Sequence, residues 1–191
     1  MANIEHFIPH IIKWEAGVTA KGLTNEQLFE KARAKGYSNK KSDRGGATMV
    51  GVTIATYTAY RRKFGIKVTS VEDLKKIDYR TWRNILKTMF WDKWKADNIN
   101  NQSMAELVVD WVWGSGLWGI KNPQQCLGVT DDGVVGSQTI TAINSCNQSA
   151  MYRRIWKRRR DYYYGIVARD SGQRVNLQGW LNRLNDQHYE D

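Results

Sequence analysis

The segment HFIPHIIKWEAG, residues 6–17, carries a carboxylate where its own pattern calls for an apolar side chain. From residue 4 onwards, apolar residues recur three and four positions apart, which is the spacing of one face of an α-helix. These residues are Ile4, Phe7, Ile8, Ile11 and Ile12. The spacing predicts a helix over residues 3–14 that is ended by Gly17, and the next position on the same face is Glu15.

Glu15 has two interpretations. A carboxyl group beside apolar side chains such as that of Trp14 has its charged form disfavoured, so it keeps its proton, which is the state that a general acid needs. The alternative is that the helix ends at Trp14 and Glu15 turns out to water. Taken alone, Glu15 fits the alternative better, because glutamates are common at helix ends.

The second feature is the segment SDRGGATMVGVT, residues 42–53. Its β-prone part, TMVGVT, predicts a small hairpin or extended turn, and glycines such as Gly51 let the backbone turn sharply or approach a ligand closely. Asp43 and Thr48 place a carboxylate and a hydroxyl on the two sides of this turn, and such a pair can hold and deprotonate a water molecule. The alternative, which the spacing alone favours, is an Asx-turn in which Asp43 bonds its own backbone.

Together the two features indicate glycoside hydrolysis. This reaction uses one protonated acid for the leaving oxygen and a second polar group on the opposite face of the sugar. Glu15 would supply the first role, and Asp43 with Thr48 the second. A helix predicted over residues 23–35 separates the two features in the chain, so they can meet only through folding.

The rest of the chain has mainly helical patterns. Thr24 and Gln27 predict a capping box at the start of the helix over residues 23–35, and Pro123 suits the start of a short helix. A longer helix is predicted from Asp78, with five residues on its apolar face. These are Trp82, Ile85, Leu86, Met89 and Phe90. The sequence therefore predicts a mainly α fold with at most one small β-hairpin.

The amino-acid composition narrows the kinds of partner and cofactor that the protein could bind. The formal charge of +10 indicates an anionic partner, and nucleic acid, a membrane surface and the bacterial wall all qualify. Nine tryptophans mildly favour a ligand that stacks on aromatic rings. No window approaches the ~18 uninterrupted apolar residues of a membrane span. Cys126 and Cys146 fit neither a disulfide framework nor a zinc pattern, so we expect two buried free thiols, with no metal and no cofactor.

The segment MYRRIWKRRRDYYYG, residues 151–165, has the strongest run of positive charge. Arginines with interleaved aromatic residues could bind nucleic acid. At helical spacing, however, Met151, Ile155, Tyr162 and Ile166 form a core stripe. Arg159 falls inside that stripe, which predicts an internal salt bridge. We therefore favour a solvated basic face, or one attracted to an anionic wall, over specific nucleic-acid binding.

Three segments resemble the glycoside hydrolase family 108 domain of bacterial and phage N-acetylmuramidases: WEAG, DRGGATMVGVT and YRTWRNILKTMFWDKW. That family carries E-G-G near its N-terminus and then D-x-G-G-x-T-x-x-G-[IV]-[ST]. The resemblance implies that Glu15 is catalytic, and the similar order of Glu, Asp and Thr in phage-type lysozymes implies Asp43 and Thr48 as its supporting pair. Further along, QQCLGVTDDGVVGSQTITAIN and GWLNR resemble the predicted peptidoglycan-binding domain that is usually joined to this family.

The chain departs from the family pattern at three places. Ala16 replaces the second residue of E-G-G, and residues 18–42 form an insertion where the family has a short loop. The family often has D-x-x-x-N-x-G in a later helix, whereas this chain has DWVWGSG, which keeps Asp110 but has Gly114 in place of Asn. If that Asn contacts the sugar, the contact is either lost or supplied by Trp113 or Trp118. Asp110 is either a functional residue, in the cleft or supporting the acid, or a helix-face aspartate bonded to a nearby arginine.

The sequence thus predicts a mainly α, lysozyme-like peptidoglycan hydrolase that cleaves the β-1,4 bond after N-acetylmuramic acid. Residues 1–97 would form the catalytic half and residues 98–191 a helical peptidoglycan-binding half, packed as one compact unit because no linker composition separates them. The expected catalytic residues are Glu15, Asp43 and Thr48. The expected substrate contacts are Trp14, Gly51, Thr53, Asp110 and Trp113.

The expected partner is bacterial peptidoglycan. We expect a monomer that has no membrane span and binds no specific nucleic acid. MANIEHF does not resemble a secretory signal, so we expect synthesis in the cytoplasm and action at the wall after holin-type or other non-classical export. Two rival interpretations stay open. One is a non-catalytic wall-binding module with a degenerate site, and the other is a basic nucleic-acid-binding protein.

Overall fold

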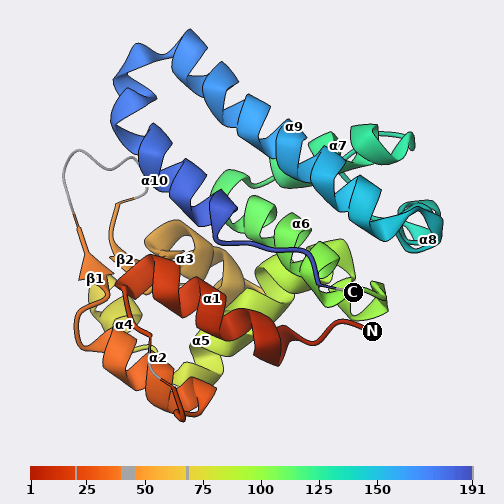
Figure 1. The fold of residues 1–191 in the computed structure, drawn as a ribbon. Coiled ribbons are helices and arrows are strands. Elements are labelled where there is room, and N and C mark those ends of the chain that lie inside the picture. The colour runs from red at the N-terminus through yellow and green to blue at the C-terminus, as the bar shows by residue number, and fades with distance from the viewer. Residues whose placement is uncertain (20, 40–45, 68, 191) are drawn as a thin grey trace. The chain divides into compact units, whose positions relative to one another are not determined.

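A computed structural model describes residues 1–19, 21–39, 46–67 and 69–190. Over these residues the chain forms ten α-helices and one small antiparallel sheet (Figure 1). It divides into two compact units, of which one is residues 4–89 and the other is residues 1–3 with 90–191. The division falls between Met89 and Phe90, whereas the boundary predicted from the sequence follows residue 97.

The unit of residues 4–89 combines five helices with the sheet. Its helices are α1 (Ile4–Ala16), α2 (Asn25–Arg33), α3 (Ile54–Arg62), α4 (Val71–Lys75) and α5 (Tyr79–Leu86). Its strands are β1 (Tyr37–Ser38), β2 (Thr48–Met49) and β3 (Val52–Thr53), in the order β1-β2-β3. Both pairings are antiparallel, with Ser38 opposite Thr48 and Thr48 opposite Thr53.

In the other unit, the described residues form helices joined by turns and loops, with no strand. Its α-helices are α6 (Gln102–Ser115), α7 (Trp118–Leu127), α8 (Ser137–Ser145), α9 (Gln148–Arg169) and α10 (Arg174–Asn185). Short helical turns precede or join them: η1 (Lys87–Trp91), which begins in the unit of residues 4–89, η2 (Asp92–Trp94), η3 (Ala96–Asn98) and η4 (Ser171–Gln173). Helices α9 and α10 run side by side, and the indole of Trp156 donates to the carbonyl of Leu184 over 3.1 Å (Figure 1).

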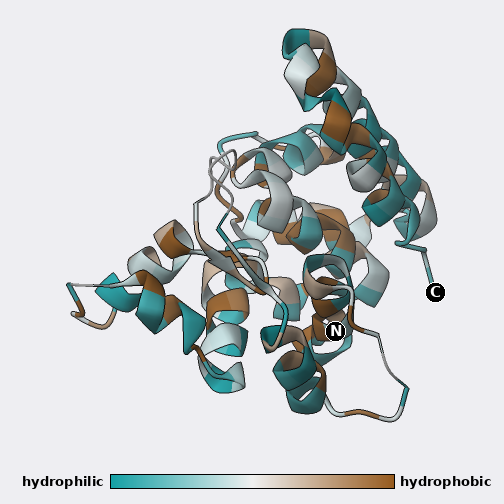
Figure 2. Ribbon diagram, turned by 90° about the vertical axis from the view of Figure 1, so that its left-hand side faces the viewer, coloured by the Kyte–Doolittle hydropathy of each residue, from teal (hydrophilic) through white to brown (hydrophobic). Residues whose placement is uncertain are grey.

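These elements confirm the mainly α, lysozyme-like fold. Helix α1 is longer than predicted and runs through Glu15, while α2 begins with the capping box that Thr24 and Gln27 predict. The sheet has a third strand, β1, that the sequence analysis did not include. Figure 2 shows hydrophobic and hydrophilic residues alternating along the helices, as expected of amphipathic helices that bury one face.

A π-helical turn explains where the apolar pattern of the helix after Asp78 fails. Trp82, Ile85 and Leu86 are fully buried as predicted, but Met89 and Phe90 are only half-buried. The turn η1 is π-helical, so one extra residue shifts the phase of the helix. Trp91 and Trp94 are consequently the next fully buried side chains.

Both prolines of the chain lie inside α-helices, and each leaves one carbonyl without its usual helical donor. Pro9 leaves the carbonyl of Glu5, which accepts instead from Asn25 Nδ2 over 3.0 Å. Pro123 leaves the carbonyl of Gly119, which accepts from Trp94 Nε1 over 3.1 Å. The prediction that Pro123 begins a helix is therefore wrong, because a tryptophan side chain satisfies the carbonyl that a proline within the helix releases.

A polar cluster around Glu5 ties α1 to α2 and α5. The carboxylate of Glu5 accepts from Arg83 Nε over 2.7 Å and from Asn25 Nδ2 over 2.9 Å. Partial burial would raise the pKa of Glu5, but the hydrogen bonds from Asn25 and Arg83 and the charge of Arg83 hold it below the usual value. Burial, and then the charge of Glu5, raise the pKa of Tyr79 to about 12. Tyr79 therefore stays a donor to Glu5 near neutral pH.

We expect Glu5→Gln to lower the free energy of unfolding by about 1–2 kcal/mol at pH 7, because charge-assisted hydrogen bonds are lost. The lowered pKa of Glu5 means that this stabilisation is complete above the ordinary pKa of glutamate and is lost as the pH falls through the lowered value. Denaturant titrations at pH 7 and near pH 3 measure the difference.

Glu72→Gln is the matched control, because Glu72 is an exposed glutamate that pairs with Lys75 over 2.8 Å. This change should move the unfolding free energy by less than about 0.5 kcal/mol at either pH. An equal effect of Glu5→Gln at both pH values would contradict the assignment of its stabilisation to the charged form.

Candidate active site

Glu15 lies in the last turn of α1, and its side chain is half-buried. Gly17 follows with a φ of 62°, so the helix ends in the left-handed conformation that the sequence predicts. The carboxyl group of Glu15 lies against the backbone of Gly51 in the turn between β2 and β3. A methyl group on Gly51 would stand 2.6 Å from Cγ, Cδ and Oε2 of Glu15, which is too close for any real side chain.

The turn that carries Gly51 has an unusual backbone. Val50 and Gly51 join β2 to β3 with φ values of 44° and 74°, which is the pattern of a type I′ hairpin turn. A β-branched residue is strained at positive φ, and such strain costs on the order of 1–3 kcal/mol. Val50 is nevertheless fully buried, its N–H donates to the carbonyl of Gly36 over 3.0 Å, and its carbonyl accepts from Trp82 Nε1 over 3.0 Å.

Thr48 and Thr53 face each other across β2 and β3, so their side chains share one face of the hairpin. Both are half-buried, whereas Met49 and Val52 are buried on the opposite face. The hydroxyl of Thr48 donates to the carbonyl of Ser38 over 3.5 Å. Thr53 is the N-cap of α3, and its hydroxyl accepts from the N–H of Thr56 over 3.1 Å. The structure thus assigns Thr53 a capping role, while a substrate contact by Thr53 stays a prediction.

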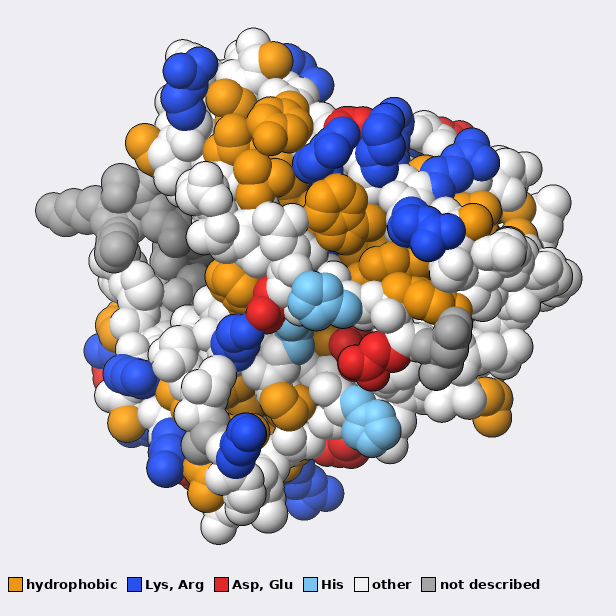
Figure 3. Space-filling model, viewed as in Figure 1, with side chains coloured by type: hydrophobic (Ala, Val, Ile, Leu, Met, Phe, Trp, Pro, Cys, Tyr) orange, Lys and Arg blue, Asp and Glu red, His pale blue; other side chains and the backbone are white. Residues whose placement is uncertain are grey.

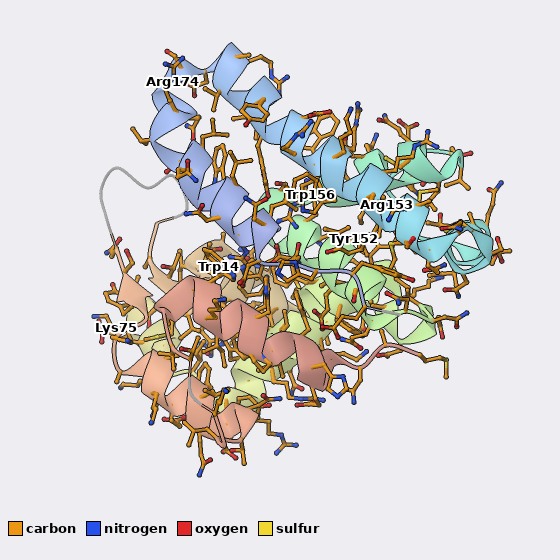
Figure 4. All side chains as sticks on the ribbon, in the orientation of Figure 1. Trp14, Lys75, Tyr152, Arg153, Trp156 and Arg174 are labelled. Carbon is orange, nitrogen blue, oxygen red and sulfur yellow. The ribbon has the colours of Figure 1, made fainter. Side chains whose placement is uncertain are left out.

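Trp14 precedes Glu15 at the end of α1 and is half-buried (Figure 4). The ammonium group of Lys13 lies 5.6 Å from the centre of its ring. Glu15, Trp14, Gly51 and the two threonines therefore all belong to one unit, on the end of α1 and on the hairpin. Asp43 lies outside the described residues.

Asp110 belongs to the other unit and has no exposed surface. Its Oδ2 accepts from Arg159 over 2.7 Å and its Oδ1 accepts from Arg183 over 2.6 Å. Arg159 is only 1% exposed and also donates to the hydroxyl of Tyr163. The salt bridge predicted for Arg159 is confirmed. For Asp110, the burial supports the interpretation as an aspartate bonded to arginine and speaks against direct contact with substrate.

Trp113 lies on α6 in the same unit as Asp110, and its ring packs against Phe90 with 4.5 Å between the ring centres. It is half-buried, so part of its surface stays open to solvent. Its contact with substrate stays a prediction. This aromatic contact covers part of Phe90, which lies within the π-helical turn η1.

The residues that hold the hairpin in place were not predicted from the sequence. Val50, Gly36 and Trp82 form this support, and no local pattern indicates it, because type I′ turns usually begin with Asn, Asp or Gly. A close approach also restricts Gly36, since a methyl group there would stand 2.8 Å from Val50 Cγ2. The structure gives Gly51 a steric role beside Glu15, while its expected contact with substrate stays a prediction.

No three His, Cys, Asp or Glu side chains gather into a metal-binding group within residues 1–19, 21–39, 46–67 and 69–190. In the same part of the chain, no helix has the length and apolar composition needed to span a membrane. Cys126 and Cys146 are free thiols, of which Cys126 is buried and Cys146 is half-buried.

The fold and this site define a lysozyme-like protein with a carboxylic acid packed against a β-hairpin. The chain belongs to the glycosyl hydrolase 108 family, which matches residues 8–116. A second family, described as a predicted peptidoglycan domain, matches residues 118–185. The protein is therefore a glycoside hydrolase that acts on peptidoglycan.

A solved structure of Brucella abortus SagA is similar to this chain, with 25% sequence identity and a TM-score of 0.68. The similarity covers 83% of this chain and 90% of that chain. No curated protein sequence matches this chain.

We expect Gly51→Ala to lower peptidoglycan hydrolysis on the order of 10²-fold, because the new methyl group displaces the Glu15 carboxyl group. Gly65→Ala is the matched control, since Gly65 has a φ of 76° and nothing within 4 Å of an added methyl group. Both changes carry the same backbone strain. Hydrolysis per folded molecule should fall only for Gly51→Ala, and equal losses in the two variants would contradict the steric role of Gly51.

We expect Asp110→Asn to lower the free energy of unfolding by about 3–5 kcal/mol, because Arg159 would remain buried without its counter-charge. Asp161→Asn is the matched control, since Asp161 is an exposed aspartate that pairs with Arg160 over 2.8 Å. It should cost less than about 1 kcal/mol. Denaturant titrations compare the two, and a folded Asp110→Asn protein of unchanged stability would contradict the structural role of this carboxylate.

Proposed function

We propose that the protein is an N-acetylmuramidase that hydrolyses the β-1,4 bond after N-acetylmuramic acid, with Glu15 as the general acid. Glu15 transfers its proton to the leaving oxygen, and water adds to the anomeric carbon. The single observation that carries the proposal is the contact of the Glu15 carboxyl group with Gly51. It brings the acid at the end of α1 to the glycine–threonine hairpin, as the resemblance to the family motifs requires.

Thr48 and Asp43 are proposed as the groups that position water or stabilise the positively charged transition state. Support for Thr48 comes from its place on the half-exposed face of the hairpin whose turn touches Glu15. Support for Asp43 comes from the motif D-R-G-G-A-T alone, since this residue lies outside the described residues. Trp14, beside the acid, is proposed as an apolar contact for the sugar.

Positive charge supports action at the bacterial cell wall. Figure 3 shows Lys and Arg side chains gathered over α9. Arg153 and Trp156 both come from this helix (Figure 4), and Arg153 is exposed. Attraction of this surface to an anionic wall raises the local enzyme concentration and weakens as salt screens the charges.

We expect Glu15→Gln to fold, to bind insoluble peptidoglycan as the wild type does, and to lose nearly all lytic activity, because the amide has no proton to transfer. Clearing of a peptidoglycan suspension measures lysis, and co-sedimentation measures binding. Glu26→Gln is the matched control, because Glu26 is an exposed glutamate on α2, and it should keep full activity. Retained clearing by Glu15→Gln would remove Glu15 from the mechanism. Binding without any clearing by the wild type would favour a non-catalytic wall-binding module.

For Asp43→Asn we expect a large but incomplete loss of clearing, because the amide still holds water but is a far weaker base. The same assay measures it, with co-sedimentation as the control for binding. Full activity of this variant would leave Thr48 as the supporting residue and remove Asp43 from the proposal.

A further inference from the structure

The unit of residues 90–191 contains a groove of about 390 Å³ with mainly apolar walls. Its lining residues are Lys93, Lys95, Gly116, Leu117, Ile120, Gly133, Val134 and Val135. Leu117 is 55% exposed and Val134 is 67% exposed, while Ile120 and Val135 form a buried floor. Exposed large apolar side chains that meet around a groove mark interaction surfaces.

A buried amide fixes one wall of this groove. The side chain of Gln124 has no exposed surface, and its Nε2 donates to Asp132 Oδ1 over 3.0 Å and to the carbonyl of Val134 over 3.1 Å. Its Oε1 accepts from the N–H of Gly133 over 2.9 Å. Asp132 Oδ1 also accepts from the N–H of Val134 over 2.8 Å. These bonds hold the turn after α7 in one conformation, in which the side chain of Val134 is exposed to solvent.

Gly133 brings the two walls of the groove together. Its φ is 81°, and a methyl group there would overlap Cδ1 of Leu117. The turn and the start of α7 are therefore packed directly against each other, so the groove is preformed. Trp118, next to Leu117 at the start of α7, is 54% exposed and extends the apolar surface.

Two lysines give the groove a cationic rim. Lys93 and Lys95 are exposed, and neither ammonium group has an ion-pair partner in the described part of the chain. Lys95 has a φ of 47°, one of the positive values found at a residue other than glycine. Strained backbone of this kind concentrates at functional sites. The groove therefore offers apolar walls and positive charge, which suit a ligand that carries both methyl groups and carboxylates.

We propose that this groove binds the peptide stem of peptidoglycan rather than its glycan strand. The stem is a short peptide with alanine methyl groups and free carboxylates, whereas the glycan presents hydroxyls that require hydrogen-bond partners. The lining residues include no acid, amide or hydroxyl side chain. Sugar hydroxyls would lose their hydrogen bonds with water there, and each loss costs free energy. This inference rests on the proposed function, because it requires that the enzyme binds peptidoglycan.

The test uses the full chain with Glu15→Gln as background, so that no substrate is cut. The sugar-free tetrapeptides L-Ala-γ-D-Glu-X-D-Ala, with X as L-Lys or meso-diaminopimelate, are titrated by calorimetry. In this background, Val134→Ser and Lys95→Gln should each weaken binding by about fivefold or more, the first by removing apolar contact and the second by removing charge. Raised salt should weaken binding to the parent protein and should have less effect on Lys95→Gln.

Two matched controls remove the same groups elsewhere in the same unit. Val175→Ser removes a valine that is 85% exposed on α10, and Lys157→Gln removes an exposed lysine on α9. Both should bind the tetrapeptides as the parent protein does. Equal weakening by the controls, or no weakening by the groove variants, would overturn the proposal.

Other ligands are distinguished in the same titration. Groove-dependent binding of the peptide-free disaccharide, or of a glycerol phosphate polymer in place of the tetrapeptides, would overturn the peptide assignment. Clearing assays with the groove variants made in the wild-type protein, which keeps Glu15, separate the proposed function from the proposed peptide groove. Tetrapeptide binding by a chain that never cleaves glycan would refute only the proposed function, whereas full lysis without any tetrapeptide binding would refute only the groove.

Discussion

The carboxyl group of Glu15 lies against a backbone position that has no room for a side chain, and this contact fixes where an acid can act. Gly51 allows the contact and also adopts the positive φ that the hairpin turn needs. Its neighbour Val50 accepts an unfavourable backbone conformation, which burial and hydrogen bonds to Gly36 and from Trp82 offset. The acid and the hairpin are thus held together by the core of one unit rather than by a flexible loop.

Local signals in the sequence predicted much of this fold. Helix α2 follows from a capping box, and α9 follows from the helical spacing of apolar residues between Met151 and Ile166. Features that depend on distant partners were not predictable. Strand β1 exists because it pairs with β2, and Pro123 is tolerated inside α7 because Trp94 supplies the missing donor. The π-helical turn after Leu86 changes which following residues face the core, and no local sequence pattern indicates this turn.

The candidate site was also predictable from the sequence only in part. Motif resemblance selected Glu15, Gly51 and Thr48, and the structure places all three on the end of α1 and its neighbouring hairpin. A helical pattern shows that Asp110 lies among apolar residues, but it cannot show what the carboxylate faces. Its two arginine partners come from helices more than forty positions away in the chain, at separations of 49 and 73 residues. The insertion over residues 18–42 contributes α2, strand β1, which pairs with β2, and Gly36, whose carbonyl accepts from the N–H of the strained Val50.

Mass spectrometry of borohydride-reduced fragments from digested peptidoglycan tests the central claim most directly, because it reports which bond is cut and how. The account predicts fragments that end in reduced N-acetylmuramic acid for the wild type, and none for Glu15→Gln. Fragments that end in reduced N-acetylglucosamine, or in 1,6-anhydro sugars that contain no added water, would contradict it.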